Sequence, residues 1–180
     1  MIYLMRHGED DESFVGGWSD VDLIERGKRQ VEAATKFIVE NNLKINKILC
    51  SDVKRAKTTA EIVNKQLNLN VFSTELLREL NKGDLTGKEK SVLKKYDTTK
   101  VDFCYPKGES MLGFYNRIKQ DLERILYEDD VLLVTHRGVI NMIYFLLNDL
   151  EVSTNKEIFE VTYASIHEYN PKIKKIKKIY

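Results

Sequence analysis

Short apolar runs alternate along the chain with longer stretches in which apolar residues recur every three or four positions. The short runs predict strands over residues 2–5, 45–50, 70–73 and 131–135. The helical spacing predicts helices over residues 26–41, 53–67, 111–126 and 138–150. Because the strands are almost continuously apolar and alternate with helices, we expect an α/β fold with a mostly parallel sheet that is covered on both faces.

Two regions depart from this alternation. A glycine-containing loop over residues 76–87 is followed by a short helix and an irregular stretch to Gly108, so we expect a small lid over about residues 76–108. After Glu157, two strand-like runs flank Asn170-Pro171, and the last holds five lysines between Lys172 and Lys178. That lysine-rich run predicts a strand at the edge of the sheet, where the lysine charges prevent pairing with the edge of another sheet. With no repeat or linker, residues 1–180 are expected to form a single domain.

Composition narrows the class of protein. The 180 residues are 42% hydrophobic and 32% charged, which excludes disordered and membrane-spanning chains. The 29 Lys and Arg nearly balance the 28 Asp and Glu, so net charge gives no reason to expect a nucleic-acid partner. Two cysteines, Cys50 and Cys104, are too few for a disulfide scaffold or a thiolate metal cage. Lacking a signal-like or membrane-length apolar segment, the protein is expected to be cytoplasmic, with no membrane partner.

Two of the three histidines come directly after predicted strands. Arg6-His7-Gly8 ends the first strand, and His136-Arg137-Gly138 comes after the strand over residues 131–135. Ligands of parallel sheets bind beyond the carboxyl ends of the strands. A neutral imidazole is a nucleophile and arginine fits phosphate oxygens, so the pattern favours a phosphoryl-transfer site over two histidines that merely bond the backbone.

Two further charged side chains fit this chemistry. Arg55 falls in the first turn of the predicted helix over residues 53–67, where it can reach an anion at the helix N-terminus. Either Ser51 or Asp52 is expected to cap that helix. Glu79, in the glycine-containing loop, could protonate a leaving oxygen. Taken singly, each of these charges could equally be a solvated surface group.

Four ordered segments carry a family resemblance: Leu4–Glu9 (L-M-R-H-G-E), Ser51–Ala56 (S-D-V-K-R-A), Lys107–Ser110 (K-G-E-S) and Leu132–His136 (L-L-V-T-H). Together they resemble the histidine phosphatase superfamily, the phosphoglycerate mutase-like proteins, from residue 1 to about residue 170. The resemblance implies a three-layer α/β/α sandwich, a phosphohistidine intermediate, and no metal or other cofactor.

The resemblance also implies roles for single residues. His7 would be the nucleophile, and Arg6, Arg55 and His136 would clamp the phosphate. Glu79 would be the general acid and later the base that activates water.

Further candidates for substrate binding are Gly8, Ser13, Trp18 and Arg137. Gly8 matches the glycine that shapes the turn, and Ser13 stands where the family often has Asn. Trp18 would lie over the substrate. Arg137 replaces the usual Gly or Asn after the second histidine. It would either bind a second anionic group of the substrate or, slightly favoured, form an outward ion pair.

The reaction is expected to be hydrolysis of a small phosphomonoester. Only 28 residues separate Glu79 from Gly108, whereas phosphoglycerate mutases carry a large insertion there. A short lid holds an intermediate away from water poorly. The alternatives are mutase-type transfer and an inactive phosphate-binding module. A metal site in His7–Glu12 is disfavoured by the neighbouring Arg6. Within the acidic tetrad Glu9–Glu12, Asp10 and Asp11 are expected at the mouth of the site, where they would disfavour bisphosphates.

Overall fold

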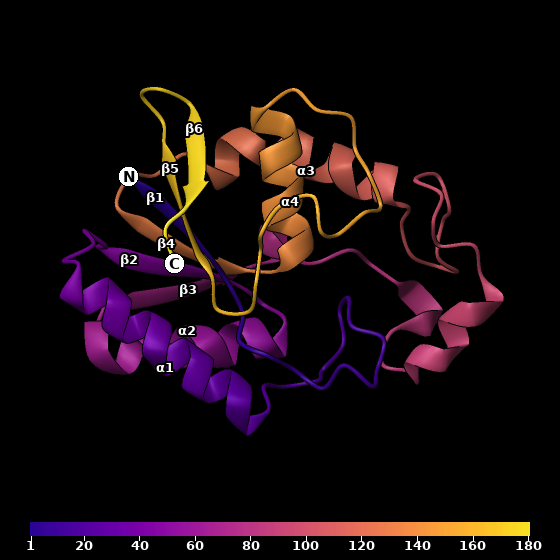
Figure 1. Cartoon of the computed structure of the whole chain (residues 1–180), viewed down its shortest axis with the longest axis horizontal. Helices are drawn as coiled ribbons and strands as arrows, with labels where there is room; N and C mark the ends of the chain where they lie inside the picture. The colour runs from indigo at the N-terminus through magenta and orange to yellow at the C-terminus, as the bar shows by residue number, and fades with distance from the viewer.

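A six-stranded sheet lies between two layers of helices in the computed structural model, which describes residues 1–180 (Figure 1). Its strands are β1 (Ile2–Arg6), β2 (Lys47–Ser51), β3 (Asn70–Thr74), β4 (Val131–Thr135), β5 (Ile166–Asn170) and β6 (Lys175–Lys178). In the order β3-β2-β4-β1-β5-β6, the first four run parallel, and β5 and β6 pair antiparallel. The predicted mostly parallel sheet is therefore confirmed.

Two pairs of helices cover the sheet, one pair on each face (Figure 1). They are α1 (Glu25–Glu40) with α2 (Lys54–Leu67), and α3 (Met111–Ile125) with α4 (Arg137–Leu147). Side chains of β1 alternate between the two layers: Tyr3 and Met5 belong to the apolar cluster of α1 and α2, whereas Ile2 and Leu4 belong to that of α3 and α4. Burial on both faces is why the sequence shows a continuous apolar run there.

Some predicted boundaries were wrong. β2 begins at Lys47, later than predicted, because a turn with Asn42 at a φ of 50° leads out of α1. α4 ends at Leu147, where the side chain of Asn148 bonds the carbonyl of Tyr144 and Asp149 adopts a φ of 52°.

The expected cap of α2 was also wrong. The capping position is Val53, and no side chain caps the helix. The Ser51 hydroxyl contacts His136 and accepts only from the N–H of Val53 itself, and the Asp52 carboxylate accepts hydrogen bonds from Arg78.

The segment expected to form a lid contains three short 3-10 helices, η1 (Glu75–Leu77), η2 (Gly83–Leu85) and η3 (Lys90–Lys95). Much of it lies at one end of the molecule, to the right in Figure 1. Gly83 has a φ of 48°, and a Cβ there would lie 2.0 Å from the carbonyl oxygen of Pro106. Only glycine allows this close approach, which joins the two ends of the segment. Movement of this segment as a lid stays a prediction.

The lysine-rich run forms β6, at one edge of the sheet, as predicted. Lys177 and Lys178 pair with Glu168 and Glu160. None of the helices has both the length and the apolar character needed to cross a membrane.

Candidate active site

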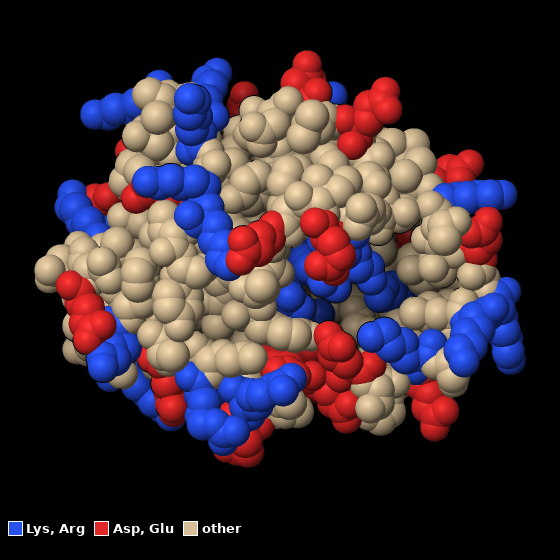
Figure 2. All heavy atoms as spheres, viewed as in Figure 1, with Lys and Arg blue, Asp and Glu red and all other residues tan.

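A cavity of about 340 Å³ includes residues at the carboxyl ends of β1 and β4 and just beyond them. Its charged lining includes Arg6, Arg55 and Glu79 beside His7. Figure 2 shows a hollow on this face in which Lys and Arg atoms gather, with Asp and Glu atoms both above and below them. The structure thus brings together four of the five residues predicted for catalysis at one cavity.

The ring of His7 is held in a single orientation. Its Nδ1 lies 2.7 Å from the carbonyl oxygen of Gly8, and its Nε2 lies 3.2 Å from Nε of Arg55. Because arginine only donates, Nε2 must accept and Nδ1 must carry the proton. His7 is 4% exposed, and burial followed by the charge of Arg55 holds its pKa well below the usual value. The ring is therefore neutral, with its lone pair on Nε2.

Gly8, predicted to shape this turn, lies against the start of α1. A Cβ at this position would lie 2.4 Å from the carbonyl oxygen of Gly27. Gly8 does not line the cavity, so it acts through the backbone path that places His7.

Arg6 presents an unpaired donor to this region. Its Nη1 donates to the carbonyl of Val161 at 2.9 Å, and its guanidinium lies 3.6 Å from the centre of the Tyr163 ring. Its Nε is buried without any hydrogen-bond partner. A buried donor without a partner is costly, so an acceptor such as a phosphoryl oxygen would be stabilising here.

Arg55 joins several parts of the site. It is the second residue of α2 and only 2% exposed. Its Nη2 donates to the carbonyl of Gly17 at 2.8 Å and to Nδ1 of His136 at 3.2 Å. Its Nε lies 3.4 Å from a carboxylate oxygen of Asp10. These contacts, with the one to His7, fix the guanidinium against Nε2 of the His7 ring.

His136 is completely buried behind Arg55 and does not line the cavity. Since its Nδ1 accepts from Arg55, its Nε2 donates to the Ser51 hydroxyl, 2.9 Å away. Burial, then the charge of Arg55, lowers its pKa well below the usual value. The rings of His7 and His136 lie edge to face with centroids 5.2 Å apart. His136 thus lies beside the nucleophile as a neutral ring.

Glu79 is held at both its carboxylate and its backbone. Its Oε2 accepts from the N–H of Gly138 at 3.0 Å, and its Oε1 from the N–H of Leu80 at 2.9 Å. Its carbonyl accepts from Nε1 of Trp18 at 2.7 Å and from Nη2 of Arg117 at 3.2 Å. These four donors place the carboxylate at the cavity.

Sequence reasoning missed Arg117. It lies on α3, eight residues after Glu109 of the K-G-E-S segment, and the two pair at 2.8 Å. Glu109 also accepts from the N–H of Asn81, and Ser110 caps α3. This segment and Arg117 therefore hold the loop that carries Glu79. The sequence did offer a signal for this pair, because Glu109 and Arg117 are eight residues apart, a spacing of about two helical turns that places two side chains on the same face.

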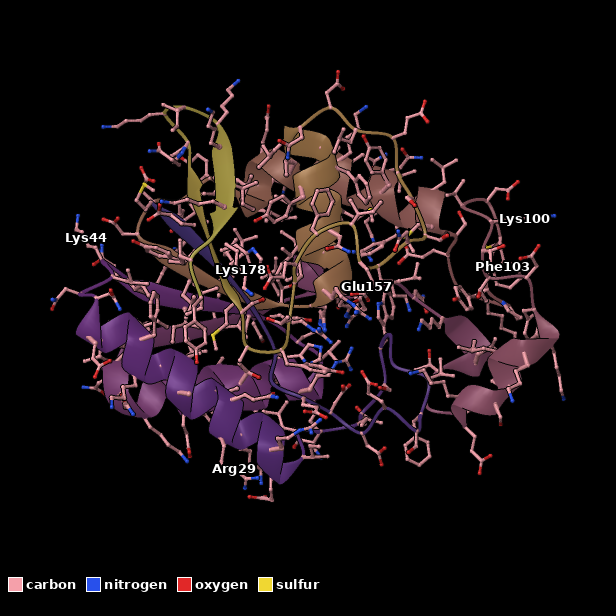
Figure 3. All side chains as sticks on the ribbon, in the orientation of Figure 1. Arg29, Lys44, Lys100, Phe103, Glu157 and Lys178 are labelled. Carbon is pink, nitrogen blue, oxygen red and sulfur yellow. The ribbon has the colours of Figure 1, made fainter.

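The other predicted binding residues are placed differently. Ser13 is exposed, and neither it nor Trp18 lines the cavity; Trp18 lies against Arg78. Arg137 does line the cavity, yet its Nη1 also donates to the exposed Glu157 at 3.1 Å. Figure 3 shows Glu157 beside a group of side chains that end in nitrogen. Both roles considered for Arg137 are thus compatible with its position.

The acidic tetrad divides into separate environments. Glu9 pairs with Arg26 away from the cavity, and Glu12 accepts from the hydroxyl of Tyr163. Asp11 is exposed at the rim. Asp10 also lines the cavity, with its carboxylate largely buried beside Arg55. That the tetrad disfavours bisphosphates stays a prediction. Burial raises the pKa of Asp10.

Comparison with known proteins identifies the family. The profile of the histidine phosphatase superfamily (branch 1) matches residues 2–178. The chain belongs to this superfamily. A human relative named 6-phosphofructo-2-kinase/fructose-2,6-bisphosphatase 3 is 31% identical over 156 residues, which are 81% of this chain and 29% of that protein. An Arabidopsis thaliana relative, phosphoglycerate mutase-like protein 4, is 31% identical over 159 residues, 79% of this chain and 69% of that protein.

The histidine phosphatase fold is also seen in solved structures. A putative alpha-ribazole-5'-P phosphatase from Escherichia coli K-12 superposes with a TM-score of 0.80 at 22% identity, covering 98% of this chain and 93% of that one. Bacillus stearothermophilus YhfR gives 0.81 at 24% identity, covering 99% and 94%. The chain spans only about three tenths of the length of the 6-phosphofructo-2-kinase/fructose-2,6-bisphosphatases that it matches.

Proposed function

We propose that this histidine phosphatase superfamily member is a phosphomonoester hydrolase that works through a phosphohistidine at His7 on a small phosphorylated metabolite, without a metal. The observation that carries the proposal is the state of His7. Its ring is neutral and fixed by Gly8, and its Nε2 lone pair lies against Arg55 at the cavity. A module that only binds phosphate needs the arginines but has no use for an oriented nucleophile.

In the first half-reaction, the phosphoryl group lies between Arg6 and Arg55, and its oxygens take up the free Nε–H of Arg6. His7 Nε2 attacks phosphorus, so the N–P bond forms as the P–O bond to the leaving group breaks. Glu79 gives its proton to the leaving oxygen. The two guanidinium groups stabilise the charge spread over the equatorial oxygens.

In the second half-reaction, water attacks the phosphohistidine while Glu79 takes its proton. Phosphate leaves and the neutral ring of His7 is restored. The buried, neutral His136 holds Arg55 in place throughout without adding a third positive charge.

Phosphate release from p-nitrophenyl phosphate in the presence of EDTA tests the activity and its independence of metal. We expect turnover by the wild type and none by His7→Ala. Labelled substrate, quenched without acid, should leave an acid-labile, base-stable phosphoryl group. Peptide mapping should place it on His7 alone among the three histidines. Label on His136, or turnover that survives in His7→Ala, would overturn the assignment.

A Glu79→Gln variant separates the two half-reactions. Because p-nitrophenolate leaves without much protonation, this variant should still become phosphorylated and then stall before hydrolysis. A variant that turns over at the wild-type rate would show that Glu79 is neither acid nor base.

Mutase-type transfer is the second candidate, because some relatives are named phosphoglycerate mutases. A labelled phosphoenzyme offered phosphoglycerates distinguishes the two. Hydrolysis gives labelled inorganic phosphate, whereas transfer gives labelled phosphoester.

A further inference from the structure

Four cationic side chains line the cavity in addition to the two arginines beside His7. They come from four separate segments: Lys82 precedes η2, Lys90 begins η3, Arg137 begins α4 and Lys156 lies between α4 and β5. Only Arg137 forms an ion pair, with the exposed Glu157. No carboxylate oxygen lies within 4.0 Å of the three lysine ammonium groups. Three positively charged side chains therefore lie at this cavity without an ion-pair partner.

This arrangement is electrostatically unfavourable without a bound anion. Lys82 is half-buried, and its ammonium lies 6.0 Å from the centre of the Tyr105 ring. Burial, followed by the charge of Lys156, lowers the pKa of Lys82 to about 8. Lys156 is exposed at the edge of the cavity, and its pKa is lowered too, by partial loss of solvent around it and then by the charge of Arg137. Each cation thus makes its neighbour harder to protonate, and a bound anion would reverse that effect.

The acids of the cavity compensate for these lysines only from a distance: the charge of Glu79 acts to raise the pKa of Lys82 and Lys156, but no acid of the cavity pairs with them. Asp10 lies against Arg55, and Glu12 accepts from Tyr163. The carboxylate of Glu79 accepts two backbone N–H groups.

Nor does the reacting phosphoryl group account for the lysines, since that group is assigned to Arg6 and Arg55 next to His7. The cavity therefore contains two sets of cations. The first set is Arg6 and Arg55, beside His7. The second set is the three lysines with Arg137, which come from four other segments of the chain.

Asn141 adds a polar contact to the same cavity. It is 4% exposed, its amide nitrogen lies 3.5 Å from the carbonyl of Lys156, and its Oδ1 is buried with no hydrogen-bond partner. Because Asn141 is among the residues that line the cavity, a hydroxyl bound there is a suitable donor for this oxygen.

We propose that the substrate is a small phosphomonoester with a second anionic group, a carboxylate or a phosphate, which Lys82, Lys90 and Lys156 bind together with Arg137. A hydroxyl of the substrate donates to Asn141. This inference rests on the proposed hydrolase function and deepens it. It is opposed to the expectation that the acidic tetrad disfavours bisphosphates. Asp10, Asp11 and Glu12 also line the cavity, but Asp10 lies against Arg55 and Glu12 accepts from Tyr163.

Three substrates with the same three-carbon chain test the inference: 3-hydroxypropyl phosphate, 2-carboxyethyl phosphate and propane-1,3-diyl bisphosphate. We expect the wild type to show at least a tenfold higher kcat/KM for one or both of the last two than for the first. Whichever is preferred identifies the anion. The preference should shrink steeply as KCl is raised, since the pairing is electrostatic and open to solvent.

The variant Lys82→Gln/Lys156→Gln should lose most of this preference, seen as a fall of at least tenfold in the ratio of kcat/KM values. The matched control Lys172→Gln/Lys174→Gln removes two exposed lysines at the turn before β6 and should keep the ratio. Equal kcat/KM for all three substrates, or a preference that neither salt nor the cavity variant reduces, would refute the inference alone. Failure to release phosphate from these substrates and from p-nitrophenyl phosphate would refute the hydrolase proposal and the inference with it.

Discussion

Gly138 leaves room for the carboxylate of Glu79, so adding one methyl group there should selectively disable Glu79 in its proposed role as general acid. A Cβ on Gly138 would lie 1.9 Å from Oε1 of Glu79 and 2.8 Å from the Phe114 ring. Non-bonded carbon and oxygen atoms need about 3.5 Å, so the carboxylate in Gly138→Ala must move by roughly 1.5 Å. A displacement of about 1 Å in a catalytic group can cost on the order of 100-fold in rate.

The assay compares two leaving groups. With an alkyl phosphate, whose alkoxide needs a proton, kcat of Gly138→Ala should fall on the order of 100-fold. Formation of the phosphoenzyme from p-nitrophenyl phosphate, observed as a burst of nitrophenolate, should change by less than tenfold.

Gly113→Ala is the matched control, because Gly113 also lies in the first turn of a helix but a Cβ there would meet nothing closer than 3.4 Å. If Gly138→Ala lowers both rates equally, or lowers neither, the assignment of Glu79 as the acid held by Gly138 is wrong.

Three more changes test separate contacts. Asp10→Asn should raise kcat/KM for a phosphomonoester by at least about fivefold at neutral pH, since a carboxylate beside Arg55 repels a dianion by about 1 kcal/mol or more. Because burial raises the pKa of Asp10, wild-type kcat/KM should fall as the pH rises through that pKa, and the variant should lack this fall. Arg117→Gln should slow alkyl phosphates at least tenfold more than p-nitrophenyl phosphate, whereas Arg124→Gln on the same helix should slow neither. His167 is buried with a pKa lowered to about 4, so the unfolded chain binds its proton first as the pH falls below about 6.5. Urea titrations should show a loss of up to about 3 kcal/mol from this group between pH 6.5 and 4, and His167→Gln should flatten that part of the pH dependence.

The sequence predicted the sheet, its covering helices and the residues that follow β1 and β4. It could do so because the apolar pattern of a strand and the identity of the residue after it are both local features of the sequence. A strand that is buried on both faces is apolar throughout, and the residue after its last apolar position must emerge at the edge of the sheet. His7 and His136 were therefore placed by the strands that precede them.

The sequence could not predict the contacts of side chains whose partners lie far along the chain. The position of Asp10 depends on a loop that pairs Asp10 with Leu23 and Phe14 with Glu89. Ser51 has the side chain of a helix cap, yet the distant His136 determines what it binds. The lysines of the cavity sit on segments that only the tertiary fold brings together, so their number in the composition carried no information about their grouping.

The placement of β1 has a consequence for synthesis of the chain. Among the strands of the sheet β1 is synthesised first, but its two neighbours are β4 and β5, which begin at residues 131 and 166. A strand with four consecutive apolar residues therefore waits for most of these 180 residues before it can pair. Such distant pairing slows folding and leaves the strand available to other unpaired edges meanwhile. The cavity beside His7 therefore cannot form until α4 and the residues up to Tyr163 have been made, because they supply part of its lining.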